Sequence, residues 1–242
     1  MLTKTEAIVL HSLKYGDQRA IVDLFTRDHG RVSFIVSLPR SAKGRMKKQY
    51  FQPLTLLSIE CDLRPQLQLQ KLREVTLLQP LASLHTDPSK LAIALFLSDF
   101  LYHALLDEQQ NEPLFDYVVS GIEWLDSCSD RFANFHLVFL MRLSRFLGFY
   151  PNLDDDGGDH YFDLRAATFT AQPPLHADFL MPEEARHIGQ LMRMDYVSMH
   201  LFRLSRSERQ RILHLLLTYY RLHLPDFPEL RSVDVLHELF SS

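Results

Sequence analysis

Cysteine is nearly absent from this sequence: its 242 residues include only Cys61 and Cys128. Two thiols so far apart cannot form a disulfide framework, and they cannot supply the four thiolates of a structural zinc site. Glycine is also sparse, and the eight glycines match neither a phosphate-binding P-loop nor a dinucleotide-binding fingerprint. No Gly-x-Ser-x-Gly or His-Glu-x-x-His motif occurs. We therefore expect a protein of a reducing cytosol that is not an enzyme and needs no cofactor.

Long apolar runs are missing as well. The most apolar stretch, 91–106, is interrupted by Asp99 and His103, and it is shorter than the roughly 20 residues that span a bilayer. The first residues lack the charged-then-apolar layout of a signal peptide. With 46% hydrophobic and 23% charged residues, the composition is that of an ordinary globular protein with a sizeable core.

The formal net charge of -4 conceals two unlike halves. Residues 1–82 hold thirteen Lys and Arg against seven Asp and Glu, whereas residues 83–242 hold thirteen against twenty-three. Because opposite fields attract opposite ligands, these charges of +6 and -10 predict different partners for the two halves.

The first half has the pattern of a small β-barrel. Apolar, partly alternating runs are typical of strands, and a loop that ends in Gly30 suits a hairpin whose glycine takes a positive φ. Five short strands in about eighty residues predict a closed barrel. The expected strands are a run that opens at 7–10 and ends near 15–17, followed by 20–25, 31–38, 54–61 and 67–78.

From Thr86 onward the apolar residues recur at helical spacing. Asp87-Pro88 predicts a capped helix start, and Ser205 to Glu208 has the spacing of a capping box. We expect an α+β protein with a barrel domain at 1–82 and an all-α domain at 83–242. An irregular loop at about 152–180, with a short hairpin inside it as an alternative, interrupts the second domain. The further expected helices are 113–125, 130–147, 182–192 and 207–222.

A dense cationic loop at 40–48 follows the third expected strand. A flexible basic loop on a barrel is suited to phosphates, while aromatic side chains on the strands provide surfaces on which bases stack. A solvated surface loop and buried aromatic residues are the alternative interpretation. The predicted DNA-binding residues are Arg19, Arg27, Arg31, Arg40, Lys43, Arg45, Lys47, Lys48, Lys71 and Arg73, with Phe34 and Tyr50 for stacking; Tyr15 and Phe51 are further aromatic candidates.

An acidic cluster at 154–160 is the one sequence that suggests a metal site. Its consecutive carboxylates and its glycines at the fourth and fifth positions do not have the spacing of an EF-hand loop. We expect a solvated acidic turn. A metal-assisted nuclease remains an alternative that a cleavage assay tests.

The order of several short segments carries a family resemblance. They are Ala7-Ile8-Val9-Leu10, Tyr15-Gly16-Asp17, Asp23-Leu24-Phe25-Thr26, Gly30-Arg31-Val32, Arg40-Ser41-Ala42-Lys43-Gly44, Phe51-Gln52-Pro53-Leu54-Thr55, Leu114-Phe115 and Leu143-Ser144-Arg145-Phe146-Leu147-Gly148-Phe149-Tyr150-Pro151. Together they resemble the RecO family of recombination mediators over most of the chain. The resemblance implies an N-terminal OB-fold barrel followed by a helical domain.

The same resemblance implies a function in DNA repair. Family members are non-enzymatic, cytoplasmic bacterial proteins associated with the nucleoid. They bind single- and double-stranded DNA, anneal strands, work with RecR, and help to load RecA onto DNA coated with single-strand-binding protein. Many members hold a structural zinc after the segment that ends in Pro151, but residues 152–170 contain no cysteine. We therefore expect no zinc, and packing by Tyr161, Phe162, Leu164 and Phe169 in its place.

The resemblance also implies that the helical domain binds the acidic C-terminal tail of single-strand-binding protein. Such a site pairs an apolar groove with cations. The predicted residues are Leu137, Leu140, Met141, Arg142 and Arg145, with Arg206, Arg209 and Arg211 on a later helix as further cations. Leucines in the core and arginines in solvent are the alternative. A protein-interaction adaptor without a primary DNA role is the alternative function.

Overall fold

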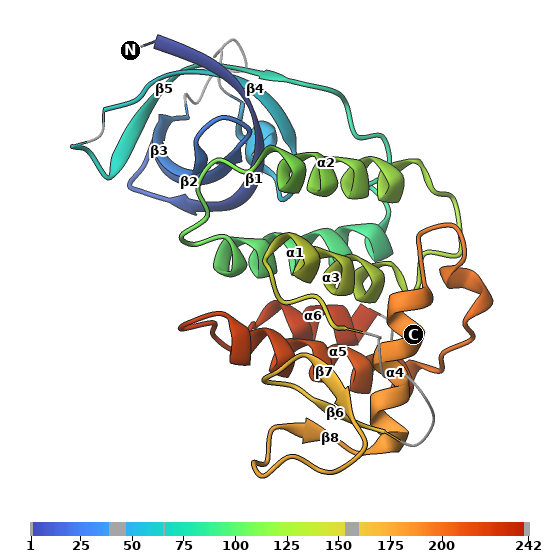
Figure 1. The fold of residues 1–242 in the computed structure, drawn as a ribbon. Helices are drawn as coiled ribbons and strands as arrows, with labels where there is room; N and C mark the ends of the chain where they lie inside the picture. The colour runs from blue at the N-terminus through green and yellow to red at the C-terminus, as the bar shows by residue number, and fades with distance from the viewer. Residues whose placement is uncertain (1, 39–46, 65, 153–159, 240–242) are drawn as a thin grey trace. The chain divides into compact units, whose positions relative to one another are not determined.

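The computed structural model describes residues 2–38, 47–64, 66–152 and 160–239. The chain forms two compact units, Met1–Ser127 with Glu229–Ser242 and Cys128–Pro228. In Figure 1 the first unit contains the blue and teal strands of a barrel and the green helices α1 and α2. No helix in the described ranges is long and apolar enough to cross a membrane.

The barrel has five strands in the order β1-β2-β3-β5-β4, and β4 pairs with β1 to close it. All the pairs are antiparallel except β3 with β5, which run parallel. This is the arrangement of an OB-fold, so the predicted five-stranded barrel is confirmed. The strands are β1 (Leu2–Lys14), β2 (Arg19–Thr26), β3 (Gly30–Ser37), β4 (Leu56–Asp62) and β5 (Leu69–Leu77), and a short helix, η1 (Lys48–Phe51), precedes β4.

The length of β1 allows it to pair on both sides. Its first half pairs with β4 and its second half with β2, and the register shifts between Val9 and His11. Such an irregularity bends a strand and helps a small sheet to close. The enclosed core is apolar and includes Ala7, Val22, Leu24, Phe34, Val36, Leu57, Ile59 and Cys61.

Glycine is required at the turn between β2 and β3. Gly30 has a φ of +66°, as the hairpin pattern predicts, and a Cβ there would lie 2.3 Å from the carbonyl oxygen of Glu108. The Thr26 hydroxyl accepts from the amide of His29 at 3.1 Å and donates to the Gly30 carbonyl at 2.8 Å. Both the backbone conformation and the close packing exclude a side chain.

Two helices follow the barrel within the first unit, α1 (Pro88–Ala104) and α2 (Glu112–Ser127). Asp87 caps α1 as predicted, because its carboxylate accepts from two amides of the first turn. Asp126 on α2 accepts backbone hydrogen bonds of 2.7–2.9 Å from residues 82–84. The connection from barrel to helices is therefore fastened to α2.

The last helix, α6 (Ser232–Leu239), belongs to the first unit and was not predicted from the sequence. The Ser232 hydroxyl donates to Asp99 on α1 at 2.6 Å. Its eight residues give too short a periodic signal to be distinguished from a loop.

The second unit contains α3 (Phe135–Phe146), α4 (Pro182–Arg193), η2 (Met199–Leu201) and α5 (Arg206–His223). The capping box at Ser205 and Glu208 is confirmed. Helix α3 begins later than the predicted residue 130, because Arg131 has a φ of 62°, which a right-handed helix excludes.

The region expected to be irregular contains a small antiparallel sheet in the order β7-β6-β8. Its strands are β6 (Tyr161–Asp163), β7 (Thr168–Thr170) and β8 (Phe179–Leu180). Phe162 and Phe169 are buried with ring centroids 4.9 Å apart, and Leu164 is buried as well. The predicted apolar packing of this segment is confirmed for these three residues.

Candidate nucleic-acid interface

One end of the barrel is formed by the turn between β1 and β2. The amide of Tyr15 donates to the Arg19 carbonyl at 2.8 Å, and the amide of Leu38, just after β3, donates to the Gln18 carbonyl at 2.7 Å. These bonds hold the turn against the end of β3. Tyr15 remains 53% exposed and offers a ring to solvent.

The strand register brings predicted cations to this end. Arg19 pairs with Ser37, and Ile35, two residues earlier on β3, pairs with Lys71 on β5. Alternation along β5 buries Gln70 and exposes Lys71 and Arg73. The outer face of three adjacent strands thus carries Arg19, Lys71 and Arg73.

Apolar side chains lie beside these cations on the same face. Leu13 pairs with Ile21, which in turn pairs with Ile35, and paired residues share one face of a sheet. Leu13 is 54% exposed and Leu69 38% exposed on the same outer face. A row of partly exposed apolar groups beside cations suits the bases and phosphates of an unpaired strand.

The ion pairs near Arg73 are weak, and its guanidinium stays exposed to solvent. Its guanidinium lies 3.9 Å from the Asp62 carboxylate, and Arg64 lies 3.3 Å from the same group. Exposed pairs of this kind contribute about 0–1 kcal/mol. Lys14 and Arg64 are exposed beside this face and were missed from the sequence, although their place next to hairpin turns was a usable signal.

The basic loop is only partly described. Lys47 and Lys48 are exposed at the start of η1, and Tyr50 is half-buried against the barrel core. The predicted residues Arg40, Lys43 and Arg45 lie outside the described residues.

The stacking role predicted for Phe34 is wrong. Its ring is 0% exposed in the barrel core, because position 34 of β3 points inward while Ile35 points outward. Phe51 is also buried, at 5% exposed.

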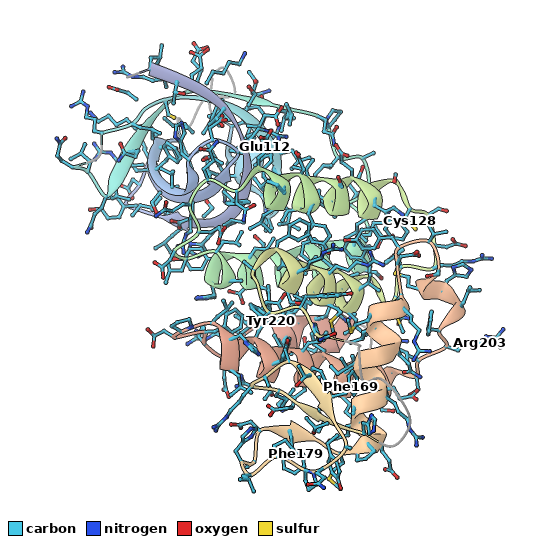
Figure 2. All side chains as sticks on the ribbon, viewed as in Figure 1. Glu112, Cys128, Phe169, Phe179, Arg203 and Tyr220 are labelled. Atoms are coloured by element: carbon cyan, nitrogen blue, oxygen red, sulfur yellow. The ribbon has the colours of Figure 1, made fainter. Side chains whose placement is uncertain are left out.

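Arg27 is not part of the cationic face. It follows the opposite end of β2 from Arg19, roughly 25 Å away at about 3.3 Å per strand residue. Its guanidinium binds Glu6 at 2.9 Å, Glu112 at 3.2 Å and Asp116 at 2.7 Å. Burial lowers the pKa of Arg27, but the bonds to Glu6 and Asp116 outweigh it and the pKa is raised. Figure 2 labels Glu112 at the start of α2 beside the barrel.

Arg31 is likewise held inside the unit. Its side chain is 9% exposed, donates to the Tyr102 carbonyl at 2.9 Å, and lies 4.1 Å from the centre of the Tyr102 ring. Asp23, 3.7 Å away, also accepts from Ser33 and contacts His11. Burial raises the pKa of Asp23, but these partners outweigh it, so the pKa is lowered. Arg27 and Arg31 therefore connect the helices to the barrel and do not belong to the cationic face.

The acidic charge of the second half is concentrated in one segment. Residues 83–127, which contain α1 and α2, hold one lysine against eight Asp and Glu, while the second unit holds eleven arginines against twelve acids. The helical part is therefore not uniformly acidic. The acids of α2 in the first unit pair with Arg27, so this cation does not add to the face that carries Arg19, Lys71 and Arg73.

The predicted partner residues on α3 are mostly unsuited to a surface role. Leu137, Leu140 and Met141 are 0% exposed, and Arg142 donates through two nitrogens to the Met194 carbonyl. The apolar periodicity of α3 reflects the core, which corrects the prediction for these four residues. Arg145 is exposed.

A different surface of the second unit combines apolar groups and cations. On the connection between α4 and α5, Val197 is 77% exposed and Leu201 is 69% exposed. Arg203, labelled in Figure 2, and Arg206 are exposed on the same connection and at the start of α5. We call Val197, Leu201, Arg203 and Arg206 the connection patch.

The residues after Pro151 do not fit the zinc that many RecO proteins hold. Asp163 and His176 form a pair at 3.3 Å and supply two donors, and the described part of the chain has no group of three or more His, Cys, Asp or Glu suited to a metal. The acidic cluster at 154–160 lies almost wholly outside the described residues.

Comparison with known proteins identifies the family. The model "Recombination protein O N terminal" matches residues 1–81, and "Recombination protein O C terminal" matches residues 85–232. The chain is 54% identical to the DNA repair protein RecO of Bacteroides fragilis, covering 99% of this chain and 100% of the relative. It is 54% identical to the RecO of Phocaeicola vulgatus, with both chains fully covered, and 35% identical to that of Flavobacterium psychrophilum, also over both full lengths. The chain belongs to the RecO family of DNA repair proteins.

Proposed function

We propose that this protein is a non-enzymatic, cytoplasmic mediator of recombination that binds DNA on the outer face of its barrel. The observation that carries the proposal is the register that places Arg19 on β2 and Lys71 and Arg73 on β5 on the same outer face, with β3 between the two strands and partly exposed apolar residues beside them. Phosphates bind the cations, and unpaired bases contact Leu13, Leu69 and Tyr15. Backbone contacts of this kind are independent of sequence and serve single- and double-stranded DNA alike.

Annealing follows from the same electrostatics. A cationic surface that neutralises two strands at once lowers their mutual repulsion and allows complementary bases to pair. In the cell the protein works with RecR and with single-strand-binding protein, is associated with the nucleoid, and promotes loading of RecA. The support for these partners is membership of the family.

The connection patch is the site we propose for the acidic tail of single-strand-binding protein. Its exposed Leu201 and Val197 suit the apolar end of such a tail, and Arg203 and Arg206 suit its acids. A labelled tail peptide should bind Leu201→Gln/Arg203→Gln at least tenfold more weakly than the parent protein. Leu175→Gln, fully exposed in the same unit, is the control and should bind normally. Unchanged binding by the double variant would reject this site.

Salt dependence tests the DNA-binding face. If Arg19, Lys47, Lys48, Lys71 and Arg73 each neutralise one phosphate, the logarithm of the affinity for a single strand falls by about 0.7 per contact for each tenfold rise in salt. From 50 to 200 mM salt the affinity then falls about 100-fold. Arg19→Gln/Lys71→Gln should reduce this fall to about 20-fold. Anisotropy of a labelled oligothymidylate measures both values.

The matched control removes two exposed cations of the same unit that lie away from the face, Lys4→Gln/Arg231→Gln. It should keep the parent salt dependence. An identical slope in both double variants contradicts the proposed face. The same oligonucleotide, incubated with magnesium, shows whether it is cut. Absence of binding supports the adaptor, and cleavage supports a nuclease.

A further inference from the structure

A cavity of about 360 Å³ lies within the first unit, beside the barrel and outside the proposed DNA-binding face. It is lined by the middle of β1, by the segment after η1, and by one side each of α1 and α6. A volume of this size is typical of cavities that accept a small ligand or a large side chain.

The floor of the cavity is apolar. Val9, Leu10 and Phe51 are 1–5% exposed. The hydroxyl of Ser98, which also lines the cavity, donates to the Leu10 carbonyl at 2.5 Å. An occupant of the floor therefore gains by burying apolar surface, which for an aromatic side chain amounts to about 150–250 Å².

The two walls remain open to an incoming group. Leu95 on α1 is 37% exposed and Val235 on α6 is 39% exposed, and both line the cavity. Large apolar side chains that stay exposed around a cavity favour a partner that covers them. One wall belongs to α6, so the cavity depends on the return of the C-terminal helix to the first unit.

The rim carries negative charge. Asp99 lines the cavity, accepts from Ser232 at 2.6 Å and lies 3.6 Å from the ring of His103. Burial lowers the pKa of His103, which favours the neutral form of this ring beside Asp99. Exposed Asp234 and Glu238 on α6 outnumber the nearby Arg231.

We propose that this cavity binds a segment of a partner protein that places an aromatic or long aliphatic side chain next to a lysine or arginine. The apolar side chain fills the floor between Leu95 and Val235, and the cation lies against Asp99. A nucleic acid base also fits an apolar cavity, but its phosphates are repelled by this rim. Buried apolar anchors with a charged neighbour are a common basis of specific protein recognition.

Two short peptides of equal length that differ in one charged residue test the proposal on the full-length protein. Acetyl-Gly-Phe-Lys-Gly-amide and acetyl-Gly-Phe-Glu-Gly-amide are titrated into isotope-labelled protein and followed by amide shifts in NMR. The lysine peptide should give saturable shifts at Leu10, Asp99 and Val235, and the glutamate peptide should bind at least tenfold more weakly. Asp99→Asn should reduce this preference to about twofold or less.

Filling the cavity provides the second arm. Val235→Trp and, from the opposite wall, Leu95→Trp both start from partly exposed positions, and each should abolish the shifts. Leu222→Trp, 39% exposed in the second unit, should bind as the parent protein does. Thermal melting identifies a tryptophan variant that fails to fold. The other tryptophan variant then tests whether filling the cavity abolishes peptide binding.

Three outcomes overturn the proposal. The first is no saturable shift at the cavity with either peptide. The second is equal binding of the two peptides, or binding that survives both tryptophan variants. The third is tryptamine, the free small molecule of the same chemistry, binding there as tightly as the lysine peptide, because a site built for a protein segment also contacts the peptide backbone.

Discussion

Replacing Arg31 by methionine separates a structural role from a DNA-binding role. The change keeps the aliphatic stem but removes a guanidinium that is 9% exposed, its bond to the Tyr102 carbonyl and its contact with the Tyr102 ring. Breaking one partner of a buried ion pair costs about 3–5 kcal/mol. Asp23 keeps the hydroxyl of Ser33 and the ring of His11, so we expect the lower end, about 3 kcal/mol.

Urea unfolding measures this loss, and a double-mutant cycle assigns it. In an Asp23→Asn background the cost of Arg31→Met should fall by about 1–2 kcal/mol, because no buried carboxylate is left without its cation. The pKa of Asp23 is lowered by folding, so its contribution is complete above pH 3.8 and disappears as pH falls through the folded pKa. The difference in free energy of unfolding between the parent protein and Arg31→Met should therefore become smaller in acid.

The same protein preparation tests DNA binding. Arg31→Met should bind oligothymidylate within about twofold of the parent at 100 mM salt, since the guanidinium faces Tyr102 and not solvent. A structural role for Arg31 is refuted if Arg31→Met unfolds at the same urea concentration as the parent protein and yet loses as much DNA affinity as Lys71→Gln.

Three further changes probe the fold. Gly30→Ala should lower stability by at least about 2 kcal/mol in urea, because the new methyl group meets the Glu108 carbonyl and the φ is positive; an unchanged midpoint would contradict the packing of this turn. Asp126→Ala should cost about 2–3 kcal/mol at pH 7 by removing the acceptor of three amides. The amides outweigh burial and lower the pKa of Asp126, so this cost should shrink as pH falls through that pKa, and a cost that grows in acid would be inconsistent. Phe162→Ala should lower the free energy of unfolding by about 3–5 kcal/mol, because it removes a buried ring from the core of the small sheet. Thermal melting with and without a chelator measures this loss. If the chelator lowers the melting temperature of the parent protein, a metal stabilises this segment instead of the aromatic core.

Local patterns were sufficient for most elements of the fold. Alternation located the five strands, and the caps at Asp87 and Ser205 located two helix starts, because these signals depend on residues close in the chain. The start of α3 was placed wrongly, since the apolar pattern did not reveal the positive φ of Arg131. The short α6 was missed because packing on α1, not periodicity, stabilises it.

The candidate site was predicted less completely. Composition shows that the first 82 residues are cationic, but not which cations share a surface. Strand register joins Arg19 to Lys71 through β3, while long-range partners turn Arg31 inward. The exposed cavity wall at Val235 was invisible in sequence, since it depends on a contact between segments more than a hundred residues apart.

By itself, the sequence indicated the family of this protein, because the order of its short motifs resembles that of RecO proteins. Its two cysteines and eight glycines match none of the metal-site or nucleotide-binding motifs considered. Only the tertiary structure decided the use of each charge. A cation binds DNA or an internal carboxylate according to what lies within about 4 Å of it, and that neighbour comes from pairing and packing between distant segments. Arg19 and Arg27 stand on one strand and its continuation, yet Arg19 is exposed on the outer face while Arg27 binds three acids, two of them on α2.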